Sequence, residues 1–130
     1  MPAFCWSQRT YAVTLTISAE SIVGIGGILP TSTLVGAGYF SLEEFLGLGD
    51  RGAVGDICCH FLDAAGNPWL PDFSERVVGL TLKQLRAIPI VIGIATGADK
   101  AASVAAVLRG GYLSGLVCDS ELAKALLEVE

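Results

Sequence analysis

The residues best suited to chemistry stand in one short loop, Thr96-Gly97-Ala98-Asp99-Lys100. An apolar, β-branched run precedes this loop and an alanine-rich stretch follows it, so the loop is predicted to join a buried parallel strand to a helix. Free backbone N–H groups at a helix start bind anions. The positive charge of Lys100 in the first turn is unfavourable next to the positive end of the helix dipole, and a bound anion would explain its presence there. A merely solvated Lys100, and a capping role for Thr96 with Asp99, are the alternatives.

A second candidate is Asp56, at the start of another predicted strand in Gly52-Ala-Val-Gly-Asp-Ile-Cys58. Strands are poor in aspartate. Asp56 is therefore either a turn or cap residue, or an acceptor for the hydroxyl groups of a polar ligand.

The third candidate is the glycine-marked strand end Ile22-Val-Gly-Ile-Gly-Gly27, which contains Gly24 and Gly26. No helix follows it directly, because Pro30 and a Thr/Ser run intervene, so the sequence does not predict a dinucleotide-binding fingerprint. Ligands of open α/β sheets bind beyond the carboxyl ends of the strands. Gly24 and Gly26 are thus expected to share one rim of the sheet with Ala95, Thr96 and Gly97.

An acid that receives hydroxyl groups, together with a lysine that receives a phosphate at a helix start, suits a phosphorylated sugar or a related polyhydroxy anion. The same residues suit catalysis less well. His60 is the only histidine and lies in an apolar strand run, which is typical of a half-buried strand residue rather than a base. Glu43 and Glu44 are typical of a solvated helix face. We therefore expect no enzyme activity.

The cysteines Cys5, Cys58, Cys59 and Cys118 form no CxxC pair, and a single histidine cannot complete a familiar zinc set. We expect reduced, buried thiols, with a redox role as the alternative, and neither a metal nor another cofactor. Cys58 and Cys59 would point to opposite faces if they lie in a strand.

The elements that would position these residues alternate between strands and helices. Residues 41–48 and a short helix from Thr81 to before Pro89 each begin with a capping box, Ser41 with Glu44 and Thr81 with Gln84. A helix is also expected over 98–109, and a last one from Asp119. Strands are expected over residues 11–17, 21–25, 54–62, 90–94 and 113–118, with 77–80 as a continuation or hairpin partner, and a loop over 26–39.

The amino-acid composition limits the kinds of partner that the chain can bind. The chain has 130 residues, which fits one domain, and 52% of them are hydrophobic while 16% are charged. So little polar material suggests either a covered partner surface, most simply that of a homodimer, or an excised piece of a larger fold. A net charge of −5 and the lack of a basic run argue against direct binding to nucleic acid. No stretch has the length of a membrane span or the pattern of a signal peptide, so a cytoplasmic protein is expected.

Four linked segments resemble a known family: Gly52-Ala-Val-Gly-Asp-Ile-Cys with Phe61-Leu-Asp-Ala-Ala-Gly66; Arg76-Val-Val-Gly-Leu-Thr-Leu-Lys-Gln-Leu-Arg-Ala-Ile-Pro89; Val91-Ile-Gly-Ile-Ala-Thr-Gly-Ala-Asp-Lys100; and Leu108-Arg-Gly-Gly-Tyr-Leu113. The chain looks like the C-terminal part of the sugar-binding effector domain of SorC/DeoR-type bacterial transcriptional regulators. On this basis residues 19–130 form that part of the domain, and residues 1–18 are an atypical N-terminal segment.

The resemblance implies a Rossmann-like, three-layer α/β fold with a mostly parallel sheet, as in sugar-phosphate isomerases and CoA transferases, incomplete at its N-terminal side. It implies that Asp56 receives sugar hydroxyls, that Lys100 meets the anionic or oxygen-rich end of the effector, and that residues 24–26 and 95–97 line the pocket. The chain departs from the family in having no DNA-binding region and in lacking most of the N-terminal half of the effector domain. Thr96-Gly97 also replaces the more usual Gly-Gly.

These observations predict the effector-binding part of a sugar-responsive transcriptional regulator without its DNA-binding domain. Two other classes stay open. One is an enzyme related to the sugar-phosphate isomerases, and the other is a truncated remnant that oligomerises and binds nothing.

Overall fold

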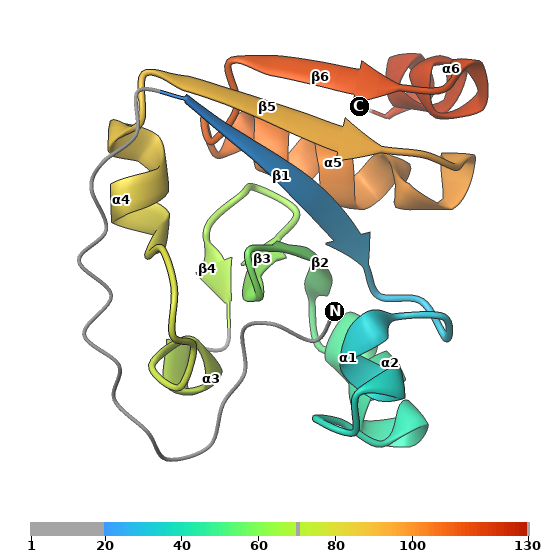
Figure 1. The fold of residues 1–130 in the computed structure, drawn as a ribbon. Coiled ribbons are helices and arrows are strands. Elements are labelled where there is room, and N and C mark those ends of the chain that lie inside the picture. Colours follow the sequence, from blue (N-terminus) through green and yellow to red (C-terminus); the bar gives the residue numbers. More distant parts are fainter. Residues whose placement is uncertain (1–19, 70, 130) are drawn as a thin grey trace.

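The computed structural model describes residues 20–69 and 71–129 and shows a six-stranded mixed sheet in the order β4-β3-β2-β1-β5-β6 (Figure 1). The strands are β1 (Glu20–Gly27), β2 (Ala53–Ile57), β3 (His60–Asp63), β4 (Pro68–Trp69), β5 (Ile90–Ala95) and β6 (Gly115–Cys118). The helices are α1 (Thr33–Gly36), α2 (Leu42–Asp50), α3 (Pro71–Ser74), α4 (Leu82–Ala87), the 3-10 turn η1 (Ala98–Lys100), α5 (Ala101–Arg109) and α6 (Ser120–Glu128). The α/β expectation is confirmed.

One half of the sheet is parallel. β5 pairs with β1, from Glu20 opposite Ile90 to Gly24 opposite Ile94, and β6 pairs with β5 on its other side. β5 is flanked on both sides by strands, which suits its β-branched run. The expected helix over 98–109 follows it, with its first turn as η1. The parallel pairing expected for most of the sheet is thus found in this half only, and the sheet as a whole is mixed.

The other half is antiparallel. β2 pairs with β1, β3 with β2, and β4 with β3. The single strand expected over 54–62 is wrong, because Cys58 and Cys59 form a two-residue turn between β2 and β3, with positive φ angles of 51° and 63°. Two left-handed residues match the twist of a hairpin turn, although Asn and Gly are the usual occupants. The two cysteines therefore do not alternate across a strand.

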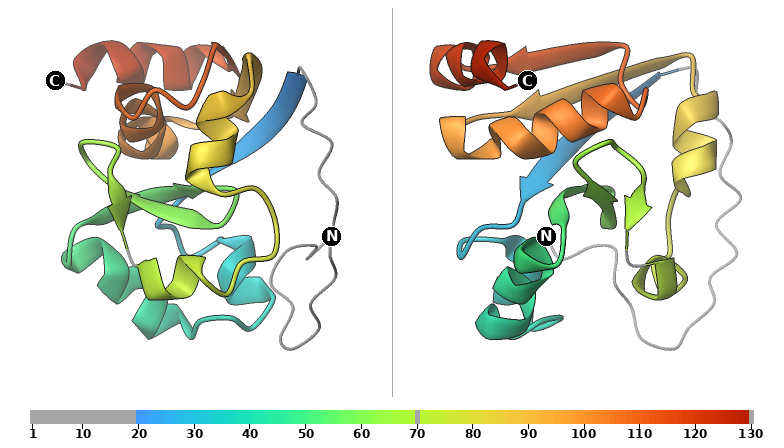
Figure 2. Two further views of the ribbon diagram at one scale, coloured as in Figure 1. Left: turned by 90° about the vertical axis from the view of Figure 1, so that its left-hand side faces the viewer. Right: turned by 180° about the vertical axis from the view of Figure 1, so that it is seen from behind.

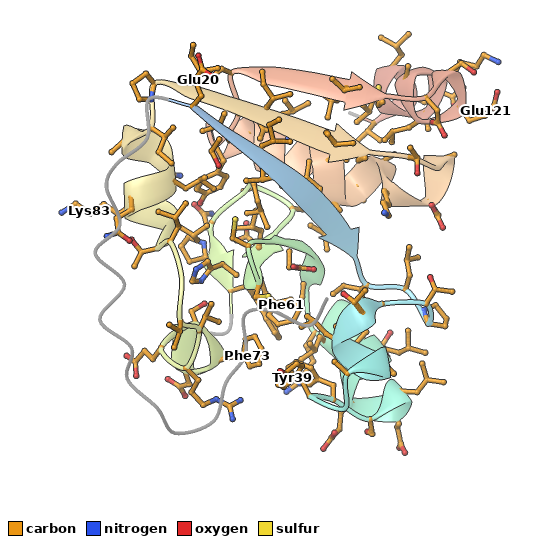
Figure 3. The ribbon with its side chains drawn as sticks, viewed as in Figure 1. Glu20, Tyr39, Phe61, Phe73, Lys83 and Glu121 are labelled. Atoms are coloured by element: carbon orange, nitrogen blue, oxygen red, sulfur yellow. The ribbon has the colours of Figure 1, made fainter. Side chains whose placement is uncertain are left out.

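The molecule has two cores. The larger one is aliphatic and spans both halves of the sheet: side chains of β1, β5 and α5, such as Val91 and Val104, pack with Ile57 of β2 and Leu62 of β3. Phe45, Phe61 and Phe73, with Phe40 beside them, form an aromatic core under the antiparallel half. Figure 2 (left) shows α5 and α6 above the short strands β2–β4 and α1–α3 below them, which gives three layers there. Figure 3 shows Phe61 and Phe73 close to each other on the side of α3.

Helix α5 ties the halves together. The Ser103 hydroxyl on α5 donates to the carbonyl oxygen of Gly26 on β1. A Cβ atom at Gly55 on β2 would collide with this same hydroxyl and with the Gly26 carbonyl. Only glycine at position 55 therefore lets α5 pack this close to β1 and β2. This close packing brings the start of α5 to the carboxyl end of β1.

Local signals are confirmed where they are strongest. Both capping boxes form, at Ser41 with Glu44 and at Thr81 with Gln84, and Asp119 caps α6. The capping pair of Thr96 with Asp99 does not form, because Gly97 precedes η1 and no side chain caps it. Residues 77–80 are not a strand; the loop is held through the Leu80 carbonyl, 2.8 Å from His60 Nε2. The loop expected over 26–39 contains the short helix α1.

Residues 1–18, and with them the strand expected over 11–17, lie outside the described residues. Within residues 20–69 and 71–129, no helix is long and apolar enough to cross a membrane.

Candidate functional site

A cavity of about 380 Å³ lies at the carboxyl end of β1, where the parallel and antiparallel halves meet. Four segments that are distant in the sequence supply its walls: β1, the loop after it, the β2–β3 hairpin and the turn before α5. The lining residues are Gly24, Ile25, Gly26, Gly27, Leu29, Thr31, Ser32, Thr33, Asp56, Cys58, Cys59 and Lys100.

The carboxylate of Asp56 on β2 covers Gly26, its paired residue on β1. Asp56 is directly paired with Gly26 in the antiparallel register, so the two residues share one face of the sheet. A Cβ atom at Gly26 would collide with the Asp56 carboxylate oxygen Oδ1. Gly26 thus has a steric role, which is to leave the space that this carboxylate occupies at the cavity wall.

The surroundings of Asp56 favour its neutral form more than water does. Burial raises the pKa of Asp56 from 3.8 to about 6, against the opposing effects of the Cys59 backbone N–H and of the Lys100 charge. Asp56 and burial in turn raise the pKa of the Cys58 thiol, burial being the larger cause. A hydrogen-bond donor or a cation brought into the cavity would therefore find an acceptor that water solvates poorly.

Lys100 lines the same cavity as Asp56 and comes from the parallel half of the molecule. It is the last residue of η1 and the N-cap of α5, it is half-buried, and its Cγ lies 3.7 Å from where a Cβ atom of Gly27 would be. Its charge lowers the pKa of Asp56 through space, yet no direct ion pair joins the two side chains among the described contacts. Both charges consequently remain available to a ligand between them.

The structure brings together four of the seven predicted site residues, namely Gly24, Gly26, Asp56 and Lys100. The described wall of the cavity does not include the other three: Ala95 is buried at the end of β5, Thr96 is exposed, and Gly97 has a φ of 93°.

The Thr96–Gly97 turn has a structural contact of its own. The Gly97 N–H donates to the Asp119 carboxylate over 3.1 Å, so the loop after β5 is held by the cap of α6. This bond fixes the segment that leads into Lys100.

Sequence reasoning missed the polar loop Thr31-Ser32-Thr33 and the thiols of Cys58 and Cys59. The loop gave a signal, since three hydroxyl residues in a row follow a glycine-marked strand end. The cysteines gave none, because their place in the wall follows from an unexpected hairpin turn.

His60 and the potential metal ligands were the other candidates for chemistry. His60 is buried and its Nε2 is bonded to the Leu80 carbonyl. In the part of the chain that the structure describes, no group of three or more His, Cys, Asp or Glu residues is placed to hold a metal ion. The described cavity has one acidic side, at Asp56, and one basic side, at Lys100.

A family model described as "Putative sugar-binding domain" matches residues 13–128. The chain belongs to this family of sugar-binding domains. The transcriptional regulator LsrR of Enterobacter sp. (strain 638) is 36% identical over 124 residues, which cover 93% of this chain and 38% of that regulator.

Solved structures agree with the family. A DeoR family transcriptional regulator from Listeria monocytogenes matches with a TM-score of 0.75 and 30% identity, over 83% of this chain and 44% of that one. The full-length sorbitol operon regulator SorC from Klebsiella pneumoniae matches with a TM-score of 0.72 and 31% identity, over 83% of this chain and 35% of SorC. The chain thus spans less than half the length of these bacterial regulators.

Proposed function

We propose that the cavity at the β1–β2 seam binds a phosphorylated sugar or a closely related polyhydroxy anion. The observation that carries the proposal is that Asp56 and Lys100 line one cavity without pairing directly. The carboxylate accepts hydrogen bonds from sugar hydroxyls, and the ammonium group attracts the anionic end. The hydroxyls of Thr31, Ser32 and Thr33 complete a polar rim, and the turn at Ala95, Thr96 and Gly97 positions Lys100 from behind.

In this proposal the chain is the effector-binding part of a cytoplasmic transcriptional regulator and has no catalytic activity of its own. Membership in the sugar-binding family, and the names of its relatives, support this role. Its acidic balance of 13 acidic to 8 basic residues supports the view that these residues do not themselves contact DNA. His60 is not placed as a base, because its Nε2 is bonded to a backbone carbonyl, and in this proposal Asp56 serves as a hydrogen-bond acceptor.

Titration calorimetry with a panel of hexose and pentose phosphates tests the proposal, with each unmodified sugar as its control. We expect at least one phosphosugar to bind, the free sugar to bind much more weakly, and Asp56→Asn to weaken binding. If no sugar phosphate in the panel gives a heat of binding, the proposal fails and the chain is a remnant that binds no effector. Conversion of a phosphosugar to product would instead support an enzyme related to the sugar-phosphate isomerases.

Self-association is a second part of the proposal. Ile94 and Val117 are 45% and 57% exposed, and their paired positions put them on one face of the parallel half. A parallel sheet is ordinarily covered on both faces. Sedimentation at micromolar concentration should therefore show a dimer, and a monomer alone would contradict this.

A further inference from the structure

A second cavity, of about 430 Å³, adjoins the first. Ser21, Ile22, Val23, Gly24, Cys58, Cys59, Val77, Gly79 and Leu80 line it. Gly24, Cys58 and Cys59 belong to the walls of both cavities, so the two hollows share a boundary. Each volume lies within the ~300–1,000 Å³ of typical ligand pockets.

The boundary between the cavities is open at Gly24. A Cβ atom added to Gly24 would meet nothing within 4 Å, and its φ angle is not in the left-handed region. Ile22, Gly24 and Gly26 alternate along β1 and hence share one face of the strand. The cavities accordingly lie end to end along this face, with no side chain at position 24 to separate them.

The two cavities differ in chemistry. None of the described lining residues of the second cavity is charged, and Ile22, Val77 and Leu80 give it apolar walls. Its far wall is also held in place, because the Leu80 carbonyl bonds to His60 and the Val77 N–H donates to the Ser74 carbonyl over 3.1 Å. An apolar wall fixed in this way is preformed for an apolar group.

We infer that the ligand of this chain has two parts: a phosphorylated sugar between Asp56 and Lys100, and an apolar substituent that crosses Gly24 into the second cavity. The ligand class is therefore an alkyl or aryl glycoside phosphate rather than a bare sugar phosphate. This inference rests on the proposed function, because it takes the first cavity as the sugar site.

The test compares matched pairs by calorimetry, such as glucose 6-phosphate with p-nitrophenyl glucoside 6-phosphate, and the same pair for other hexoses. Burial of an aryl ring, less the cost of ordering it, should make the glycoside phosphate bind about tenfold more tightly. Equal affinity within a pair that binds would overturn the inference and leave the proposed function intact. If no member of any pair binds, the proposed function fails and the inference fails with it.

Variants locate the effect. Ile22→Asn changes only the second cavity and should remove most of the tenfold advantage while the bare sugar phosphate binds as before. Gly24→Val should remove the advantage as well, because its side chain would stand at the boundary. Val117→Asn is the matched control, since Val117 is exposed on the same sheet face and lines neither cavity; it should change neither affinity.

A second copy of the chain could occupy the apolar cavity instead. Sedimentation of the parent and of Ile22→Asn distinguishes this case. Loss of a dimer in Ile22→Asn, together with an unchanged ratio of affinities, would overturn the inference in favour of a protein interface.

Discussion

The two halves of the sheet are built by different means. The parallel half packs on the aliphatic core, which also includes Ile57 and Leu62 of the antiparallel half, and α5 returns the chain from β5 to β6. The antiparallel half has an aromatic core with four phenylalanine rings, and short turns join its strands. Each half supplies one charge to the site, Lys100 from the start of α5 and Asp56 from β2.

In such a fold, a site can arise where the two differently built halves meet. The candidate cavity lies at the seam, where β1 is parallel to β5 and antiparallel to β2. Glycines at positions 26 and 55 let the carboxylate and the helix approach β1 closely. Neither half alone would contain both charges.

The largest expected effect is on the aromatic core. Phe61→Ala should lower the free energy of unfolding by about 3–5 kcal/mol, because it removes a fully buried ring that contacts three others. Val107→Ala in the aliphatic core should cost less, about 2 kcal/mol. Urea denaturation measures both variants. Equal losses of unfolding free energy would contradict the expectation that the Phe61 ring contributes more to stability than the Val107 side chain.

Lys100→Ala tests what the parallel half supplies to the site. We expect phosphosugar binding to weaken by about 2–5 kcal/mol, a factor of tens or more. The free energy of unfolding should change by less than about 0.5 kcal/mol, because Lys100 makes no described ion pair and opposes the helix dipole. Lys124→Ala, which removes an exposed ion pair on α6, is the control and should bind as the parent does.

Asp56→Asn tests the antiparallel half through pH. Burial raises the pKa of Asp56 to about 6, so between pH 4 and pH 6 the folded chain holds a proton that the unfolded chain has released. The free energy of unfolding therefore falls as pH rises through this window, by on the order of 2–3 kcal/mol from this group. Asparagine does not titrate, so the variant should lack this fall.

Denaturation of parent and variant at pH 4, 5, 6 and 7 measures the difference. Asp63→Asn is the opposite control, because the Asn67 backbone N–H, as the largest cause, holds the pKa of Asp63 below its usual value. Its removal should cost stability at neutral pH and nothing at low pH. Identical pH profiles for Asp56→Asn and the parent would contradict a raised pKa at Asp56.

The smallest expected effects are at the helix caps. Ser41→Ala, on α2 of the antiparallel half, should cost about 1 kcal/mol. Asp119→Ala, on α6 of the parallel half, should cost somewhat more, about 1–2 kcal/mol, because Asp119 also accepts the Gly97 N–H. Thermal unfolding of both variants compares them. A larger loss in Ser41→Ala would show that the bond to Gly97 adds nothing.

Local chemistry made much of this fold predictable. The capping boxes at Ser41 and Thr81, and the strand that leads into Lys100, follow from residues a few positions apart. Asp56 and Lys100 were found in the same way, as polar residues at strand and helix ends. Their presence in one cavity is shown by the structure, and their role in binding stays a prediction.

Long-range contacts made the rest unpredictable. The turn at Cys58 and Cys59 lacks the Asn or Gly that marks a hairpin, so residues 54–62 look like one strand. Residues 77–80 have the apolar pattern of a strand, yet His60 bonds the Leu80 carbonyl and leaves them as a loop. The mixed sheet itself depends on β1 pairing on both sides, which no local pattern encodes.

The position of β1 at the seam also orders the folding of the chain in time. Ile57 of β2 meets His60 of β3, and Leu62 meets Pro68, across loops of a few residues, whereas Glu20 has to meet Ile90 across most of the chain. Closing long loops is slow, and contacts between near neighbours form first. The side of the site that carries Asp56 is thus expected to be in place before α5 delivers Lys100. Effector binding would then report that folding is finished.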